Sequence, residues 1–357
     1  MATRPLLDLI EHLNLRQELN PDQVDLAVAA LVDAGENREM KGDFLRALRN
    51  KGETAAEIAC FVAALLARGV DPGIDPGSVE GPLIDVCGTG GDRMDLFNIS
   101  TTAMFLLAAG GAVVVKHGNR GVTSQSGGAD VLEALGVRIE CPPEALRECI
   151  ATTGMGFIFA PAYHPSFKVI APVRLTLAAQ GITTIFNILG PLLNPACPPF
   201  QMAGIYSETL LPKYAESLRL LGRRCAWAVH GSSGPRGSGL DELSTLGVNN
   251  YCEIKEGAIR AHTLDPARLG FPKAKIEELR GGDASKNAKV LTGILSGQIR
   301  GPKRDIVILN AAAAFVVCGL APDMAEGIAR AGEQLKSGRA LARLKALQDV
   351  SAAHPGR

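Results

Sequence analysis

A glycine-rich turn carries the first polar residues of this sequence whose types and spacing suggest chemistry. The run Asp85-Val86-Cys87-Gly88-Thr89-Gly90-Gly91-Asp92 ends an apolar segment, and Asn98-Ile99-Ser100-Thr101 opens a helical pattern. Glycines let a backbone approach a ligand closely, and a helix N-terminus adds partial positive charge. The pattern is typical of a phosphate-binding loop, although ordinary strand-to-helix turns are also glycine-rich. Asp92 would repel a bare phosphate, so we expect it to hold a sugar hydroxyl or a metal ion.

A second polar loop follows the next apolar run. It reads Lys116-His117-Gly118-Asn119-Arg120-Gly121-Val122-Thr123-Ser124 and comes directly after Ala-Val-Val-Val. Lys116 can bind phosphate oxygens as a point charge and Arg120 as a fork. His117 is interpreted either as a general acid or base, or as a packed residue that fixes the loop, and we favour the packed role. The loop by itself could be a solvated surface segment, but two such loops in succession favour phosphate binding.

The elements that must position these loops are predicted from periodicity and helix caps. The first seventy residues contain only helical patterns, with capping boxes that begin at Asn20 and Thr54. Residues 70–82 hold three prolines and three glycines and are predicted to be a linker. Short β-rich runs then alternate with helical segments, which predicts a mostly parallel sheet. Strands are expected at 83–87, 112–116, 155–160, 202–206 and 225–229, and helices at 100–109, 129–135, 143–153, 210–221, 285–296, 305–319 and 324–336.

The composition excludes several other classes of protein. The 357 residues carry 37 basic and 37 acidic side chains. The chain therefore lacks the excess of basic residues that is typical of a nucleic-acid-binding protein. The apolar fraction of 46% argues against a disordered chain. The eight cysteines are scattered without a metal-binding spacing, and the N-terminal residues contain no secretory signal, so a reduced cytoplasmic protein is expected. The longest apolar run, near 311–320, is too short to span a bilayer, and no membrane partner is expected.

Taken together, these motifs resemble the anthranilate phosphoribosyltransferase family, and the resemblance extends over nearly the whole chain. The two loops are followed in order by further segments similar to that family: Gly127–Gly136, Tyr163-His164-Pro165, Ala171-Pro172-Val173-Arg174, Phe186–Pro195, His230-Gly231 and Leu240–Ser244.

The resemblance implies a fold, a reaction and partners. The expected fold class is α/β, with a small N-terminal helical domain and a large α/β domain whose mostly parallel central sheet is flanked by helices. The helical domain is expected at 1–70, joined by the helical segment near 167–182, and the phosphoribosyl-binding domain at 71–357. The implied reaction transfers the 5-phosphoribosyl group of phosphoribosyl pyrophosphate (PRPP) to the amine of anthranilate and releases pyrophosphate, a step of tryptophan biosynthesis. Two Mg²⁺ ions and a homodimer are also implied.

The resemblance further assigns residues by position. The anthranilate site is expected at Gly88, Asn119, Arg174, Tyr163 and His164, of which Tyr163 and His164 could equally be plain loop packing. Metal ligands are expected at Ser100, Asp241 and Glu242; without the other motifs, Asp241-Glu242 would be interpreted as a solvated pair. No nucleophile or base is assigned, and Lys116, Asn119 and Arg174 are expected to stabilise the transition state. The expected PRPP site comprises Gly88, Thr89, Gly91, Asp92, Asn98, Ser100, Thr101, Lys116, His117, Gly118, Asn119, Arg120, Gly121, Val122, Thr123, Ser124 and Gly128.

The chain departs from the family pattern at a few positions. Arg93 and Leu96 replace a Gly and a Thr, and Gly128 stands where Ser is common. The link from Arg174 to Phe186 is longer than usual, with Thr183-Thr184 in place of a Gly-x-Arg-Thr sequence, and Gly231–Gly239 is also lengthened. The phosphate and metal groups are largely intact, so the departures concern mainly the acceptor side.

Two alternatives remain at this point. A pyrimidine nucleoside phosphorylase has a similar helical-plus-α/β plan, but the Lys116–Arg120 loop and the Asp241-Glu242 pair favour the transferase. A non-catalytic nucleic-acid-binding paralogue is the second alternative, and the zero net charge argues against it.

Overall fold

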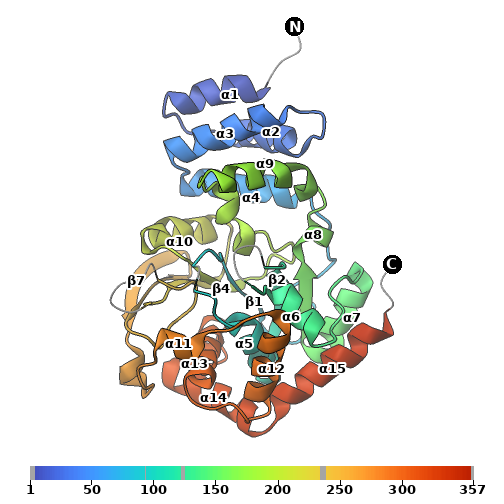
Figure 1. The fold of residues 1–357 in the computed structure, drawn as a ribbon, viewed down its shortest axis with the longest axis vertical. Coiled ribbons are helices and arrows are strands. Elements are labelled where there is room, and N and C mark those ends of the chain that lie inside the picture. The colour runs from blue at the N-terminus through green and yellow to red at the C-terminus, as the bar shows by residue number, and fades with distance from the viewer. Residues whose placement is uncertain (1–4, 93, 122–124, 234–238, 355–357) are drawn as a thin grey trace.

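The N-terminal part of the chain is a helical bundle (Figure 1). The computed structural model describes residues 5–92, 94–121, 125–233 and 239–354. The bundle contains α1 (Pro5–Asn14), α2 (Pro21–Val32), α3 (Arg38–Lys51) and α4 (Ala55–Leu66), which pack on one another. A later helix, α9 (Phe167–Ala179), packs against α2 and α3. Both predicted capping boxes are present, because Asn20 accepts from Gln23 N–H and Thr54 from Glu57 N–H. Leucines of α1, valines of α2 and aromatic residues of α3 and α4 fill the bundle interior.

A seven-stranded sheet forms the centre of the larger part, with the order β3-β2-β1-β4-β5-β6-β7. The strands are β1 (Leu83–Gly88), β2 (Val113–Gly118), β3 (Met155–Phe159), β4 (Phe200–Gly204), β5 (Cys225–His230), β6 (Asn249–Lys255) and β7 (Ala258–Leu264). β1 to β5 are parallel, whereas β6 and β7 are antiparallel. The predicted α/β class with a mostly parallel sheet is therefore confirmed.

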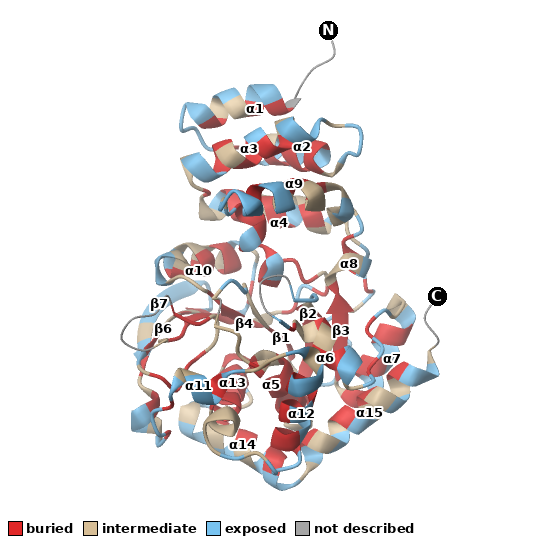
Figure 2. Ribbon diagram, viewed as in Figure 1, coloured by how far each residue is buried: buried red, intermediate tan, exposed pale blue. Residues whose placement is uncertain are grey.

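Helices cover both faces of the sheet, as the buried residues in Figure 2 show. One face packs on α5 (Ile99–Ala109) and α13 (Pro302–Val317). Helices α6 (Gly128–Ala134), α12 (Ala284–Leu295), α14 (Met324–Lys336) and α15 (Arg339–Ala353) extend the same core, and α11 (Ile276–Leu279) packs on α13. The other face packs on α10 (Leu211–Leu220), whose core is continuous with that of the helical bundle. α7 (Pro143–Thr153) and α8 (Ala160–Tyr163) pack near β3. Short 3₁₀ helices lie at Ile185–Asn187, Gly190–Leu192, Glu208–Leu210 and Pro266–Leu269. No helix among the described residues is long and apolar enough to cross a membrane.

The hairpin of β6 and β7 and the helix α15 were not predicted. The first four residues of β7 are all exposed. This edge strand therefore lacks the alternation of apolar and polar residues that marks a half-buried strand. The structure joins the two strands by a tight turn in which Glu256 and Gly257 both adopt positive φ, at 52° and 77°. Two such residues form the tight turn that joins antiparallel strands.

A buried polar network lies under the carboxyl ends of β1 and β2. Asp85 on β1 is fully buried, and its carboxylate accepts from Asn194 Nδ2 at 2.9 Å and from His117 N–H at 3.3 Å. Asn194 also donates to Val115 O at 2.7 Å and accepts from Ala196 N–H at 3.0 Å. Burial raises the pKa of Asp85 to about 6, against the opposing effect of Lys116. This network ties the ends of two strands to the 185–197 segment.

Replacing Asn194 tests how far the fold depends on this network. Asn194→Ala removes one hydrogen-bond partner each from Asp85, Val115 O and Ala196 N–H, all of them buried, and we expect a loss of about 3 kcal/mol in the free energy of unfolding. Urea unfolding followed by circular dichroism measures it. The control is Asn250→Ala, which removes a bond from Asn250 to the Glu208 carboxylate at the surface and should change stability by no more than about 0.5 kcal/mol. Equal effects of the two substitutions would contradict a structural role for the network.

Candidate active site

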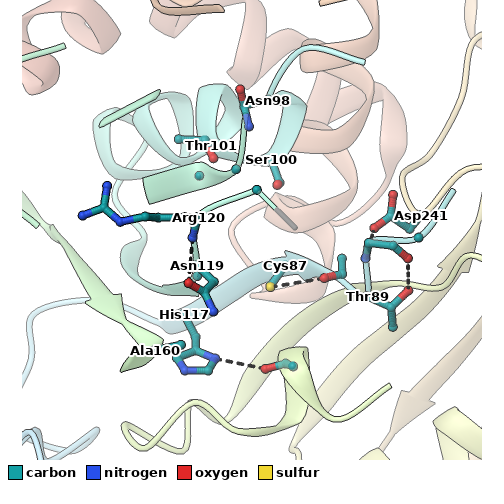
Figure 3. A pocket seen from close by; sticks show the side chains of 18 of the residues that line it. Cys87, Thr89, Asn98, Ser100, Thr101, His117, Asn119, Arg120, Ala160 and Asp241 are labelled. Carbon is teal, nitrogen blue, oxygen red and sulfur yellow. Dashed lines mark hydrogen bonds between the residues drawn. The ribbon is translucent and has the colours of Figure 1, made fainter. Parts of the chain in front are cut away.

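A cavity of about 340 Å³ opens at the carboxyl ends of β1 and β2 (Figure 3). Ligands of open α/β sheets bind at this edge. The cavity is lined by both predicted loops, by the N-terminal ends of α5 and α6, by Asp241-Glu242 and by parts of the 160–193 segment.

Most of the predicted site residues line this one cavity. They are Gly88, Thr89, Gly91, Asp92, Asn98, Ser100, Thr101, Lys116, His117, Gly118, Asn119, Arg120, Gly121, Gly128, Arg174, Asp241 and Glu242. Tyr163 and His164 are not part of the lining: both are almost completely buried, and Tyr163 packs in the core near β3. The predicted residues Val122, Thr123 and Ser124, and the departure at Arg93, lie outside the described residues.

Glycines at three strand ends make room for the Asp241-Glu242 segment. A Cβ atom at Gly88, at the end of β1, would overlap the Asp241 carboxylate, and one at Gly204, at the end of β4, would overlap the Asp241 carbonyl. A Cβ atom at Gly231, just after β5, would overlap the carbonyl of Glu242. The segment therefore crosses the strand ends at a distance that only glycine permits. Asp241 Oδ2 accepts from Gly90 N–H at 2.6 Å, and Glu242 Oε1 accepts from Ser100 N–H at 3.1 Å.

Three carboxyl groups, those of Asp92, Asp241 and Glu242, crowd this corner of the cavity. Loss of hydration and repulsion from Asp92 and Glu242 raise the pKa of Asp241 well above its usual value. Loss of hydration also raises the pKa of Asp92, and raises that of Glu242 to about 7. Asp92 and Asp241 share a hydrogen bond. These groups keep protons at pH values where free carboxylic acids are ionised, so the corner favours binding of a cation.

Lys116 supplies positive charge beside this corner. Its side chain is buried, and Nζ donates to Val86 O and to Ser100 Oγ, the latter at 3.1 Å. The ammonium group opposes the rise in pKa of both Asp85 and Glu242. Lys116 thus lies between one carboxylate under the sheet edge and another in the cavity, beside the N-terminus of α5.

The second loop is held by Asp130, which sequence reasoning did not single out. Its Oδ2 accepts from Gly121 N–H at 2.7 Å and from Gly127 N–H at 2.8 Å. The guanidinium of Arg120 pairs with Glu133, with Nη2 and Oε1 3.0 Å apart, and points away from the other labelled side chains in Figure 3. Phosphate binding by the Arg120 fork would therefore require this ion pair to open.

Aromatic rings and one arginine form the opposite wall. The Arg174 guanidinium lies 5.2 Å from the centroid of Phe186, and Phe167 packs edge-on against Phe186 at 5.6 Å. His164 stacks on Phe167 from behind, at 5.2 Å between ring centroids. Among the described residues, no carboxylate forms an ion pair with Arg174, and burial lowers the pKa of its guanidinium. This wall can accept a flat ring that carries a negative charge.

His117 has the packed role that we favoured for it. Its Nδ1 lies 3.0 Å from Gly190 O, which requires Nδ1 to carry the proton and to donate it. Burial is the main cause that lowers the pKa of His117, to about 3, and its ring packs edge-on against His164 at 5.4 Å. His117 is therefore neutral and anchors the loop to the Gly190-Pro191 turn.

The structure shows the surroundings of three departures from the family pattern. Leu96 forms an antiparallel bridge with Arg280. A Cβ atom at Gly128 would come within 3.1 Å of Thr101 Oγ1, so glycine suits this close packing. The longer link is taken up by α9 and by the turn at Gly181, and Thr184 N–H donates to Asn187 Oδ1 at 2.8 Å.

Sequence reasoning missed residues on segments that approach the loops only in the fold. Phe167 and Phe186 line the cavity, and Asn287 and Asn310 bind its loops from the C-terminal helices. Glycine at the end of β4 and after β5 was an available signal, because a strand that ends in glycine often marks close approach of another backbone.

Comparison with known proteins agrees with this geometry. Residues 7–69 match the model of the helical bundle domain of a glycosyl transferase family, and residues 80–341 match the model of its a/b domain. The anthranilate phosphoribosyltransferase of Anaeromyxobacter dehalogenans is 43% identical over 93% of this chain and 94% of its own length. That of Methanocorpusculum labreanum is 46% identical over 86% of each.

Solved structures show the same similarity. The crystal structure of anthranilate phosphoribosyltransferase from Thermus thermophilus matches with a TM-score of 0.86 and 37% identity, over 97% of this chain and 99% of that one. The enzyme from Saccharomyces cerevisiae in complex with PRPP and Mg matches with a TM-score of 0.84 and 27% identity, over 98% of both chains. This chain belongs to the anthranilate phosphoribosyltransferase family of glycosyl transferases.

Proposed function

We propose that this chain transfers the 5-phosphoribosyl group of PRPP to the amine of anthranilate and releases pyrophosphate. The bond from the ribose C1 to the pyrophosphate oxygen breaks, and its electrons leave with pyrophosphate. The nitrogen lone pair forms the new bond to C1, and the nitrogen then loses a proton. Such a reaction needs a site that stabilises a highly charged leaving group and holds the amine in line.

One observation carries the proposal: three crowded carboxyl groups lie beside Lys116 and the N-terminus of α5 in the same cavity. Diphosphate alone would be repelled by Asp92, Asp241 and Glu242, and a metal ion alone would be repelled by Lys116. A metal–diphosphate complex would suit both charges, because Asp241 and Glu242 would hold the metal, and Lys116 and the loop N–H groups would hold the phosphates.

The oxygen-rich corner fits Mg²⁺. Among the described residues, no group of three or more His, Cys, Asp or Glu side chains is disposed to hold a metal by itself. Mg²⁺ is typically bound by one or two carboxylates together with substrate phosphates, so a pair of carboxylates is sufficient. We propose Asp241 and Glu242 with Ser100 as the ligands, and two ions as the family resemblance implies. When bound, the metal would neutralise charge that develops on the leaving pyrophosphate.

The remaining residues fall into two groups. We propose that the glycine-rich loop, Asn98, Thr101, Lys116 and the Gly118–Gly121 backbone bind the donor. We propose that Arg174 binds the anthranilate carboxylate, with Phe167 and Phe186 against its ring and Asn119 near its amine. Tyr163 and His164 are assigned a supporting position behind this wall.

Assembly, location and domain limits are further proposals. We propose a homodimer that forms through the helical bundle, where Leu7, Leu15, Leu26 and Leu175 are exposed. A cytoplasmic location is consistent with the eight cysteines, which are all free thiols. The limits 1–70 and 71–357, with 167–182 joined to the bundle, are supported by the packing of α9 on α2 and α3.

A fluorescence assay tests the function. Mixing the protein with anthranilate, PRPP and Mg²⁺ should remove the anthranilate signal, and adding EDTA should abolish the loss because the carboxylate corner would lack its cation. Phosphorolysis of a pyrimidine nucleoside that is insensitive to EDTA would instead support a nucleoside phosphorylase. Salt-sensitive binding of single-stranded DNA without turnover would support the nucleic-acid-binding alternative.

Arg174 is expected to act on the acceptor. Arg174→Ala should raise KM for anthranilate on the order of 30- to 100-fold, because the substrate carboxylate loses a charged partner, with little change in KM for PRPP. Arg174→Lys should recover only part of the loss, since lysine lacks the planar fork. Arg219→Ala, which removes an exposed partner of Glu216 on α10, is the control and should have no effect. Equal changes in both KM values for Arg174→Ala would refute the assignment.

Mg²⁺ binding is expected to release protons. The pKa of Glu242 is raised to about 7 and that of Asp241 is raised well above its usual value, so the metal-free corner is partly protonated near neutral pH. Mg²⁺ needs ionised ligands, so its affinity should increase as pH rises from about 6 to about 8. Calorimetry with Mg²⁺ and inorganic pyrophosphate, in buffers of different ionisation enthalpy, measures affinity and protons released. Glu242→Gln should lower the Mg²⁺ affinity and reduce the number of protons released. A Mg²⁺ affinity that does not depend on pH would contradict the prediction.

A further inference from the structure

Two buried asparagines on the C-terminal helices make contact with the loops of the candidate active site. Asn287 lies on α12 and Asn310 on α13, and their exposed fractions are 1% and 0%. Neither belongs to the segments that carry the sequence motifs, and neither lines the cavity. The amide group of Asn287 bonds the loops at the start of α5, and that of Asn310 bonds the segment that follows Asp241-Glu242.

Asn287 holds the donor-loop half. Its Nδ2 donates to Asn98 Oδ1 at 3.0 Å, and Asn98 Nδ2 in turn donates to Ser126 O at 3.1 Å. This chain of bonds connects α12 with the start of α5 and with the loop after β2. Because Asn98 makes no side-chain cap of α5, its amide orientation is set by these two partners.

The segment before α12 fixes Asn287 itself. Gly282 N–H donates to Asn287 Oδ1 at 2.9 Å, and Gly281 N–H donates to Asp95 O at 2.8 Å. A Cβ atom at Gly281 would come within 2.6 Å of Asn287 Oδ1 and 2.7 Å of Phe97 N, so this approach requires glycine. The amide of Asn287 therefore has one orientation, with its donor toward Asn98.

Asn310 holds the carboxylate half. Its Oδ1 accepts from Leu243 N–H at 2.9 Å, and its Nδ2 donates to Leu243 O at 2.7 Å and to Ile306 O at 2.9 Å. Both polar groups of the Leu243 backbone are bound by this one side chain. Leu243 directly follows Asp241-Glu242, whose backbone crosses the glycine ends of the strands, so a shift at Leu243 displaces both carboxylates.

We infer that Asn287 and Asn310 are positioning residues for two separable parts of the site: Asn287 orients the donor loops through Asn98, and Asn310 holds the Asp241-Glu242 carboxylates in register. The inference rests on the proposed function, since it takes these parts to bind PRPP and Mg²⁺. A purely structural role would make the two residues equivalent, whereas the positioning role makes their effects differ.

Asn287→Ala should raise KM for PRPP on the order of tenfold, because Asn98 loses its orienting donor. The increase should persist at saturating Mg²⁺, and KM for anthranilate should stay unchanged. Asn287→Asp, which keeps the acceptor for Gly282 but loses the donor, should give the same pattern and covers the case in which the alanine variant is unstable.

Asn310→Ala should instead raise the Mg²⁺ concentration for half-maximal rate on the order of tenfold, and excess Mg²⁺ should restore the rate. Asn310→Ser is the milder second variant. A binding measurement independent of turnover uses Mn²⁺ with inorganic pyrophosphate, followed by electron paramagnetic resonance. Mn²⁺ affinity should fall for the Asn310 variants and remain near that of the wild type for the Asn287 variants.

Gln334→Ala is the matched control, because Gln334 is a buried amide on α14 that bonds Arg330 O and does not line the cavity. It should change neither the PRPP nor the Mg²⁺ dependence. The inference is overturned if the Asn287 and Asn310 variants lose activity in the same way, with lower thermal stability and unchanged KM and Mg²⁺ dependence. Failure of the proposed function is distinguishable from this, because the wild-type protein would then not convert anthranilate at all.

Discussion

The site depends on one steric constraint: the Asp241-Glu242 backbone crosses the carboxyl ends of β1, β4 and β5 at a distance that permits no side chain. Gly88, Gly204 and Gly231 meet this constraint, and a Cβ atom at any of them would overlap the crossing segment. The crossing brings two carboxylates to the glycine-rich loop and to the first turn of α5, where Gly90 and Ser100 donate N–H groups to them. Without it, the acidic pair and the phosphate-competent loops would lie on separate parts of the molecule.

The electrostatics follow from this placement. Three carboxyl groups with raised pKa values share a corner whose nearby cation, Lys116, also faces Asp85 below the sheet edge. Without a ligand, this corner lowers the stability of the protein, because removing a charged group from water costs free energy unless an opposite charge or hydrogen bonds compensate it. A metal–diphosphate substrate brings both a cation for the carboxylates and an anion for the ammonium. The crowding of carboxyl groups that destabilises the free site would thus favour binding of a metal–diphosphate donor.

The two sides of the cavity are built differently. The side that we propose for the donor consists of backbone and polar side chains at the ends of two adjacent parallel strands. The side that we propose for the acceptor consists of aromatic rings from the 167–186 segment and of Arg174, which lies on a helix that packs within the helical bundle. His117 joins the two sides, because it belongs to the donor loop and bonds the Gly190-Pro191 turn. Changes in the helical bundle can therefore reach the wall formed by Arg174, Phe167 and Phe186 through α9.

The sequence by itself determined the features that depend on neighbours along the chain. Capping boxes, alternating strands and helices, and two polar loops after strands are local patterns, so the α/β class and the two loops at the sheet edge could be predicted from them. Tertiary structure decided the rest, because it depends on contacts between distant segments. Arg120 is engaged by Glu133, Tyr163 and His164 pack behind the cavity wall, and Phe167 and Phe186 form that wall. Likewise, Asn287 and Asn310 have no pattern that marks them, since the groups they bind lie far away in sequence and meet them only after the sheet and its helices have packed.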